Sequence, residues 1–275
     1  MAKKVGYLGP PGTFGEQAAL LYDGSAELVA LPSNGAVVVA VEAGQVDEGI
    51  VPIENSLDGG INETLDALIR NESVHLRAEL VLPVEHNLIA AKGTAIEQVT
   101  VVMSHPSALA QCRAFLESAL PAARLEAALS TAGAVETAVT RPGTAAIGTR
   151  RAAELASGEV LAAAIQDVAH NKTRFFALGR EDAAPSGQDK TSIAFTVAHD
   201  RPGTLLGVLR ELADRGINLT RIESRPSRED LGIYVFLLDF EGHHDDPGVA
   251  DALSAVRGQA QYFRLFGSYP LAGGQ

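Results

Sequence analysis

Residues 171–176, Asn-Lys-Thr-Arg-Phe-Phe, place a hydroxyl group, two cations and two aromatic rings side by side. The guanidinium of Arg174 offers a planar fork of N–H donors that fits a carboxylate, and the rings would lower the local dielectric. The Thr173 hydroxyl adds a hydrogen-bond donor beside this cation. The segment is therefore a candidate for holding an anionic substrate, although a final edge strand with solvated charges would have the same composition.

A second polar group, Glu54-Asn55-Ser56, directly follows the apolar run at 49–53. If that run is a strand, the three side chains lie at its carboxyl end, where open α/β sheets bind ligands. An ordinary loop that caps the helix predicted to start near Asn62 is the alternative.

Ser104-His105-Pro106 ends another predicted strand and begins a helix that carries Gln111. A serine hydrolase is not indicated, because the chain has no Gly-x-Ser-x-Gly elbow and adjacent Ser and His side chains do not readily face one another. His105 by itself is compatible with a hydrogen-bonded structural role.

Two further turns come before predicted helices. The turn Gly9–Phe14 could gather backbone N–H groups around an anion. Its two prolines remove donors and no Gly-Lys-Ser/Thr ending follows, so a phosphate loop is not indicated and a tight strand-to-helix turn remains possible. Ser130-Thr131 precedes Ala132 as a helix cap that could also contact a ligand.

Metal chemistry finds little support in the sequence. The run His243-His244-Asp245-Asp246 has suitable ligand types, but neighbouring side chains usually diverge, so we expect an exposed turn. The single cysteine, Cys112, excludes an intramolecular disulfide and a cysteine-based metal cluster.

The elements that must position these residues alternate between β-branched runs and amphipathic Ala/Leu-rich runs up to about residue 178, which predicts an α/β unit with a largely parallel sheet. Predicted strands span 5–8, 27–31, 49–53, 80–90, 99–103, 124–129, 144–147 and 174–178, and predicted helices span 16–22, 36–42, 62–70, 106–120, 132–139 and 150–156. The polar stretch 181–189 reads as a linker. Beyond it, the order βαββαβ matches a ferredoxin-like unit.

The composition bounds the function. A chain of 275 residues with 46% hydrophobic residues has room for two or three packed units. Its net charge of -12 would repel nucleic acid and anionic membranes. The apolar run at 5–10 is too short for a secretory signal, and the run at 36–41 is far too short to span a membrane. We therefore expect a cytoplasmic protein.

Five motifs, in order, resemble those of the prephenate dehydratase family. They are Gly-Pro-x-Gly-Thr-Phe at 9–14, Pro-Ile-Glu-Asn-Ser at 52–56, Ser-His-Pro-x-Ala-Leu-x-Gln at 104–111, Ser-Thr-Ala at 130–132 and Asn-x-Thr-Arg-Phe at 171–175. Pro-Gly-Thr-Leu at 202–205 and Ile-Glu-Ser-Arg-Pro at 222–226 resemble an ACT module, so the resemblance covers nearly the whole chain. Gly15, Phe176 and Thr204 depart from the usual pattern, which leaves fine substrate contacts and effector affinity open.

The resemblance implies a fold. An α/β catalytic domain at 1–180 would consist of two lobes like those of periplasmic binding proteins, approximately 1–77 plus 168–180 and 78–167, with the site in the cleft between them. A ferredoxin-like βαββαβ ACT domain would follow at 190–270. No chorismate mutase segment precedes residue 1, so we expect the monofunctional form.

The resemblance also implies a reaction, the decarboxylating dehydration of prephenate to phenylpyruvate, water and CO2 in phenylalanine biosynthesis, with no metal or organic cofactor. Thr173 would donate a hydrogen bond to the leaving hydroxyl, and Arg174 would pair with a substrate carboxylate. The implied catalytic residues are Thr173, Arg174, Glu54, Asn55 and Gln111, and the implied substrate-binding residues are Thr13, Phe14, Ser56, Ser104, His105, Thr131 and Phe175.

ACT modules of this kind pair through their sheets and bind L-phenylalanine between them, which implies a homodimer or homotetramer with feedback control. The implied effector-binding residues are Gly203, Thr204, Leu205, Leu206, Asn218, Leu219, Glu223, Ser224 and Arg225. Two alternatives remain open: an arogenate dehydratase, which applies the same chemistry to the amino analogue, and a catalytically silent amino-acid-binding regulator.

Overall fold

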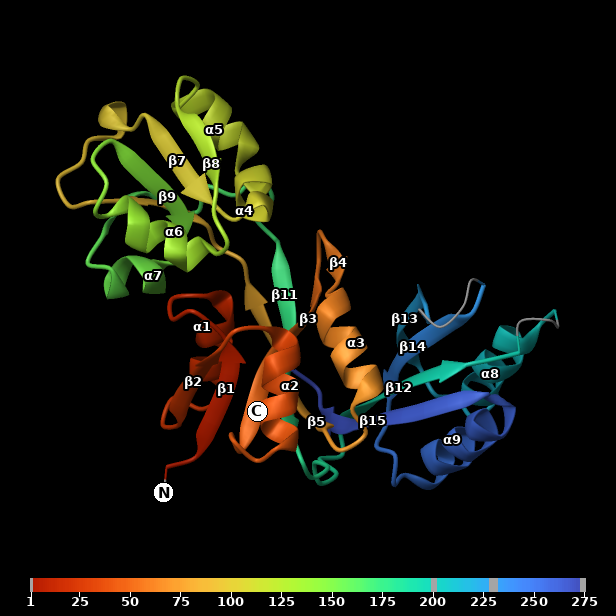
Figure 1. The fold of residues 1–275 in the computed structure, drawn as a ribbon. Helices are drawn as coiled ribbons and strands as arrows, with labels where there is room; N and C mark the ends of the chain where they lie inside the picture. Colours follow the sequence, from red (N-terminus) through yellow and green to blue (C-terminus); the bar gives the residue numbers. More distant parts are fainter. Residues whose placement is uncertain (1, 199–201, 228–231, 273–275) are drawn as a thin grey trace.

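The computed structural model describes residues 2–198, 202–227 and 232–272, and these residues form three sheets with helices packed on them (Figure 1). Two sheets belong to the N-terminal two-thirds of the chain and define two lobes. The third sheet belongs to the C-terminal domain. No helix in the described ranges has the length and apolar character needed to cross a bilayer.

The first lobe contains a six-stranded sheet of order β2-β1-β3-β11-β5, with β4 paired to β3. Its elements are β1 (Lys4–Leu8), α1 (Phe14–Tyr22), β2 (Glu27–Leu31), α2 (Asn34–Glu42), β3 (Glu48–Asn55), β4 (Gly59–Gly60), α3 (Asn62–Arg70), β5 (His75–Pro83) and β11 (Lys172–Gly179). Strands β1, β2 and β3 are parallel, whereas β11 runs antiparallel to both β3 and β5. Helix α1 packs on one face of this sheet and α2 and α3 on the other.

The second lobe contains a five-stranded sheet of order β10-β6-β9-β7-β8. Its elements are β6 (Asn87–Ala90), a 3-10 turn (Ile96–Gln98), β7 (Val101–Ser104), α4 (Pro106–Gln111), α5 (Arg113–Ala119), β8 (Arg124–Ala127), α6 (Thr131–Ala138), β9 (Thr144–Gly148), α7 (Arg150–Leu155) and β10 (Glu159–Ala162). The predicted helix 106–120 is therefore two helices, because Cys112 leaves the helical conformation with φ -117 and ψ 20.

The boundary between the lobes differs from the expected one. The predicted strand 80–90 is two strands in different sheets, β5 and β6, and the chain passes between the lobes after Pro83 rather than at residue 77. Proline has no N–H for a ladder, so β5 ends there. The return crossing lies between β10 and β11, and Val84 N donates to Asn171 O (2.9 Å) where the two crossings meet.

The C-terminal domain has the expected βαββαβ order. Its elements are β12 (Asp189–Thr196), α8 (Thr204–Ala213), β13 (Leu219–Pro226), β14 (Tyr234–Glu241), α9 (Pro247–Gln259) and β15 (Tyr262–Pro270). They form an antiparallel sheet of order β13-β14-β12-β15. Helices α8 and α9 cover one face of this sheet and share a core with Phe195, Leu238 and Phe240.

The other face of the C-terminal sheet packs directly on the first lobe (Figure 1). Leu237, Phe266 and Tyr269 are buried in the same apolar cluster as Leu68 of α3 and Phe176 of β11. The rings of Phe176 and Tyr269 meet edge to face with centroids 4.9 Å apart. Because this cluster is continuous, the first lobe shares a core with the inner face of the C-terminal sheet, in addition to the separate core under α8 and α9.

Candidate active site

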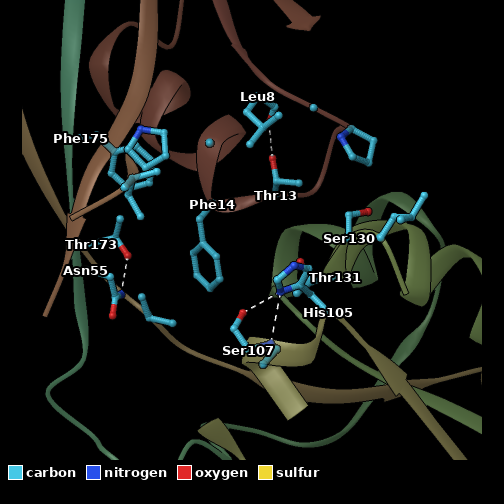
Figure 2. Close-up of a pocket in the computed structure, with 18 of the residues that line it drawn as sticks. Leu8, Thr13, Phe14, Asn55, His105, Ser107, Ser130, Thr131, Thr173 and Phe175 are labelled. Atoms are coloured by element: carbon cyan, nitrogen blue, oxygen red, sulfur yellow. Dashed lines mark hydrogen bonds between the residues drawn. The ribbon is translucent and has the colours of Figure 1, made fainter. Parts of the chain in front are cut away.

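A cavity of about 910 Å³ is lined by residues of both lobes. Figure 2 shows Asn55, Thr173 and Phe14 on one side of it and His105 and Thr131 on the other. The lining includes eight residues predicted from the sequence: Thr13, Phe14, Asn55, His105, Gln111, Thr131, Thr173 and Phe175. The expected cleft between two lobes is therefore present, and these eight side chains meet there.

Helices begin at this cavity. Ser130 Oγ caps α6 by accepting from Gly133 N (3.0 Å), and His105 Nδ1 caps α4 by accepting from Ser107 N (3.3 Å). Thr13 caps α1, and its hydroxyl also donates to Leu8 O (3.0 Å). This side chain therefore lines the cavity and is hydrogen-bonded to the backbone at the same time. The described lining residues include no lysine or arginine. The partial positive charge that the cavity has from the protein backbone therefore comes from the N–H groups at the starts of α1 and α6.

The hydroxyl of Thr173 is oriented by Asn55. Asn55 Oδ1 accepts from Leu57 N (2.9 Å) and Asp58 N (3.1 Å), which fixes the orientation of its amide. Its Nδ2 must then donate, and it does so to Thr173 Oγ1 (2.9 Å). Because Thr173 Oγ1 accepts this bond, its own proton is available to a ligand in the cavity.

The amide network continues from Asn55 through the return crossing into the second lobe. Asn55 Nδ2 also donates to Asn171 Oδ1 (2.9 Å), and Asn171 Nδ2 donates to Gln111 Oε1 (3.1 Å). Gln111 Nε2 in turn donates to Asp58 Oδ2 (3.0 Å), which closes a bridge from the second lobe back to the first. Gln111 therefore ties the lobes together and lines the cavity between them.

The predicted site residues leave out several polar residues of the site, among them Asp58 and His86, which line the cavity, and Asn171, which bonds to Asn55 and Gln111. His86 is buried and lines the cavity, its Nε2 lies 3.0 Å from Gln111 Oε1, and burial lowers its pKa despite this hydrogen bond. The sequence gives no signal for His86 beyond its place after a proline-ended strand. Asn171 was visible, because it stands two positions before Thr173 and points to the same face of the chain.

The structure corrects the expected role of Arg174. Neighbouring side chains on a strand point to opposite faces, so Thr173 faces the cavity and Arg174 faces away from it. Arg174 Nε pairs with Glu79, Nη1 contacts Asp239 Oδ2 (2.5 Å), and Nη2 donates to Tyr269 Oη (2.9 Å). Burial would lower the pKa of Arg174, but these partners raise it above the usual value, so the guanidinium stays charged. It does not line the cavity.

Glu54 is corrected in the same way. It is the register partner of Arg174, and its carboxylate points toward the C-terminal domain, where Oε2 lies 3.1 Å from Arg221 Nε and 4.0 Å from Arg174 Nη1. Neither Glu54 nor Arg174 is placed to touch a molecule bound beside Thr173.

Two predicted substrate-binding serines support the framework and do not line the cavity. Ser104 is fully buried and donates to Ile147 O (2.7 Å), which joins β7 to β9. Ser56 donates to Asn171 Oδ1 (3.1 Å) and accepts from Lys172 N (3.0 Å). Both serines hold backbone segments that carry cavity residues.

The predicted effector-binding residues occupy two segments of the C-terminal domain. Gly203, with φ 84, precedes α8, which begins with Thr204, Leu205 and Leu206. Asn218 and Leu219 lead into β13, which also carries Glu223, Ser224 and Arg225. Arg225 departs from the expectation, because its guanidinium is buried against α3, paired with Asp66 and bonded to Asn62 O.

The predicted exposed turn at His243 is also wrong in part. His243 is buried, its Nε2 lies 3.2 Å from Ala183 O, and its Nδ1 accepts from Asp245 N (3.1 Å). Ligand atoms of His243, His244 and Asp245 lie within 4.8 Å of one another. Both ring nitrogens of His243 already have backbone partners, so the arrangement fixes the linker and does not present an open metal site.

Comparison with known proteins gives consistent results. A family model described as prephenate dehydratase matches residues 5–183, and a model of the ACT domain matches residues 191–258. The chain is 42% identical to a bifunctional chorismate mutase/prephenate dehydratase of Aquifex aeolicus, over 98% of this chain and 74% of the relative. It is 41% identical to a prephenate dehydratase of Amycolatopsis methanolica, over 98% of this chain and 90% of the relative.

A solved structure of a prephenate dehydratase from Arthrobacter aurescens, in complex with L-Phe, superposes with a TM-score of 0.90 at 35% identity. The match covers 99% of this chain and 91% of that one. The similarity therefore includes both lobes and the C-terminal domain.

Proposed function

The chain belongs to the prephenate dehydratase family, and on this basis we propose that its inter-lobe cavity is where prephenate loses carbon dioxide and its ring hydroxyl. The enzyme is a hydro-lyase of phenylalanine biosynthesis. The electrons of the C–CO2 bond enter the ring as the C–OH bond breaks, and one proton converts the departing hydroxide to water. Phenylpyruvate, CO2 and water then account for all atoms of the substrate.

The observation that carries the proposed mechanism is the donor bond from Asn55 to Thr173. It occupies a lone pair of the Thr173 oxygen and leaves the hydroxyl proton for the leaving oxygen of the substrate. A positioned donor in a pocket shielded from water lowers the barrier, because it stabilises charge that develops only in the transition state. Threonine is too weak an acid to stay deprotonated, so Thr173 acts as a donor or relay for a proton from water.

The lack of a cation in the described lining fits this chemistry. Negative charge leaves the ring carboxylate as the C–C bond breaks. A guanidinium on that carboxylate would stabilise the reactant more than the transition state and would slow the reaction. The position of Arg174 on the opposite face of β11 is therefore favourable for decarboxylation.

For regulation, we propose that L-phenylalanine binds the ACT domain, at the turn beginning at Gly203 and along β13, where two chains pair. Leu206 and Ile222 in these segments are 58% and 48% exposed, and β13 is the outer strand of its sheet. An edge strand with exposed apolar residues is a ready surface for a second copy. A homodimer or a dimer of dimers in the cytoplasm is the corresponding assembly.

The decisive experiment is steady-state turnover of prephenate by Thr173→Ala and Thr173→Ser. We expect Thr173→Ala to lower kcat by roughly 10² to 10⁴ with a small change in KM, because a positioned proton donor is lost. Thr173→Ser should keep much of the activity. Thr140→Ala, at an exposed threonine of the second lobe, is the matched control.

Near-normal turnover by Thr173→Ala would remove this hydroxyl from the mechanism. Parallel kinetics with arogenate decide between the two dehydratases. Wild-type protein that forms no phenylpyruvate from prephenate and no phenylalanine from arogenate would favour the silent regulator.

A further inference from the structure

The ladder between β3 and β11 has the active site on one face and the ACT domain on the other. In the register of this pair, Thr173 lies opposite Asn55 and Arg174 lies opposite Glu54. Thr173 and Asn55 line the cavity. Glu54 and Arg174, one position away on each strand, contact residues of the C-terminal sheet. Only the thickness of one sheet therefore separates the catalytic hydroxyl from the regulatory domain.

On β13, the charged side chains of Arg221 and Glu223 point toward this ladder. Arg221 Nε lies 3.1 Å from Glu54 Oε2, and Arg221 also pairs with Glu223. The carboxylate of Glu223 lies against β4, because a Cβ on Gly60 would be only 2.7 Å from its Oε2. These contacts link the strand proposed to sense the effector to the hairpin that begins at Asn55.

Arg174 forms a second link, and this one is buried. The side chain of Arg174 is 13% exposed, and those of Glu79 and Asp239 are 4% and 3% exposed. Glu79 belongs to the first lobe, whereas Asp239 belongs to the C-terminal sheet and is held by Ser192 Oγ (2.6 Å). Loss of one partner in such a cluster leaves a buried charge unpaired, which is costly, so β11 is held firmly to β14.

We propose that Glu54 and Arg174 are positioning residues through which the ACT domain acts on Asn55 and Thr173. The Asp239–Arg174 pair holds Thr173 in the resting enzyme, and the Arg221–Glu54 contact transmits the movement of β13 when the effector binds. This route rests on the proposed regulation by phenylalanine. When the effector moves β13, the Arg221–Glu54 contact shifts β3 relative to β11 and disturbs the hydrogen bond from Asn55 to Thr173. Displacement of a reacting group by about 1 Å is enough to cost on the order of 10²-fold in rate.

The regulatory part of the route is tested with Arg221→Gln in the full chain. We expect kcat within about threefold of wild type, retained phenylalanine binding by calorimetry, and an inhibition constant at least tenfold higher, about 1.4 kcal/mol of lost coupling. Arg215→Gln, which breaks an ion pair with Glu211 at the C-terminal end of α8, is the matched control and should keep wild-type inhibition.

A double-mutant cycle then identifies the partner. Glu54→Gln and Arg221→Gln should together weaken inhibition no more than either alone, because they remove the same contact. Wild-type inhibition of Arg221→Gln with normal effector binding would overturn the route, and so would additive effects in the cycle. Loss of phenylalanine binding in Arg221→Gln would assign the residue to the effector site and likewise overturn it.

The positioning part is tested without effector. Asp239→Asn removes a charge from the Arg174 cluster outside the cavity, and it should lower kcat roughly tenfold with KM nearly unchanged, as expected for an effect on the transition state alone. Ser192→Ala, which removes one hydrogen bond to Asp239, should give a smaller effect in the same direction if Asp239→Asn folds poorly. A folded Asp239→Asn variant with the wild-type kcat would overturn the claim that the Asp239–Arg174 pair positions Thr173. A wild-type enzyme insensitive to phenylalanine would overturn the regulatory route together with the proposed regulation and leave the positioning result standing.

Discussion

The orientation of the Asn55 amide decides whether the Thr173 hydroxyl can donate its proton to a ligand. Asn55 Oδ1 is held by two backbone N–H groups, so its Nδ2 can only donate to Thr173 Oγ1. The same amide donates to Asn171, which extends the chain of fixed amides to Gln111 and His86. A hydroxyl at the end of such a chain is oriented before the substrate arrives.

An isosteric change at Asn55 tests this polarity. In Asn55→Asp the oxygen that replaces Nδ2 would accept from Thr173 and withdraw its proton from the cavity. We expect kcat to fall by roughly 10²-fold or more, the range for loss of a positioned donor. KM should also rise, because a carboxylate repels an anionic substrate. The two parameters are measured from pH 6 to 9, and turnover within about twofold of wild type would refute the orientation argument.

Five ordered motifs identified the family, and they carried Thr173, Asn55 and Gln111 correctly to the cavity lining. They misplaced Arg174 and Glu54, because a motif records which residues stand together and not which face of a strand each one occupies. The position of Arg174 could have been predicted from the sequence. Thr173 and Arg174 are neighbours on a predicted strand, so only one of their side chains could enter a cavity on one side of the sheet. His86 could not be found, since its role depends on contact with Gln111 from the other lobe.

At the scale of elements, helix α2 packs very closely against β3, the strand that ends at Asn55. A Cβ on Gly49 of this strand would lie 2.6 Å from Val37 Cγ1 and 2.8 Å from Val41 Cγ2. The glycine is needed for this close approach and not for an unusual backbone angle. The strand therefore depends on the absence of a side chain at position 49.

Gly49→Ala is expected to lower the free energy of unfolding by about 1–3 kcal/mol, the usual cost of overpacking a close-packed core. Urea denaturation followed by circular dichroism measures it. Gly248→Ala in α9 is the control, because an added Cβ there meets no atom within 4 Å. Equal stability of the two variants would show that α2 can move away from β3 without cost.

The order of helices and strands was largely predictable, and the sheet assignment was less so. Apolar periodicity gave α3 at 62–70 and β2 at 27–31 with the observed bounds. It merged β5 and β6, because apolar residues dominate both strands and only the three residues 84–86 lie between them. Strand pairing depends on contacts between distant segments, which a local pattern does not contain.

At the scale of the whole molecule, β13 presents its outer edge and Ile222 to solvent. We expect the chain to sediment as a dimer or tetramer, with Ile222→Asp shifting it toward the monomer, because a charge is costly in an apolar contact. Sedimentation velocity over a range of concentrations measures the shift. Leu155→Asp on the second lobe, at a side chain that is also 48% exposed, is the control. An unchanged mass for Ile222→Asp would place the pairing surface elsewhere.

The core shared by the first lobe and the ACT domain also limits how feedback control can be lost. Cutting the chain at the linker would expose Leu68, Phe176 and their neighbours to water, and Arg174 would lose Asp239 while keeping Glu79. Selection for cells that overproduce phenylalanine should therefore yield substitutions along β13 and hardly ever truncated proteins. We therefore expect removal of the sensor to destabilise the catalytic lobe, and deregulated strains should carry a complete chain.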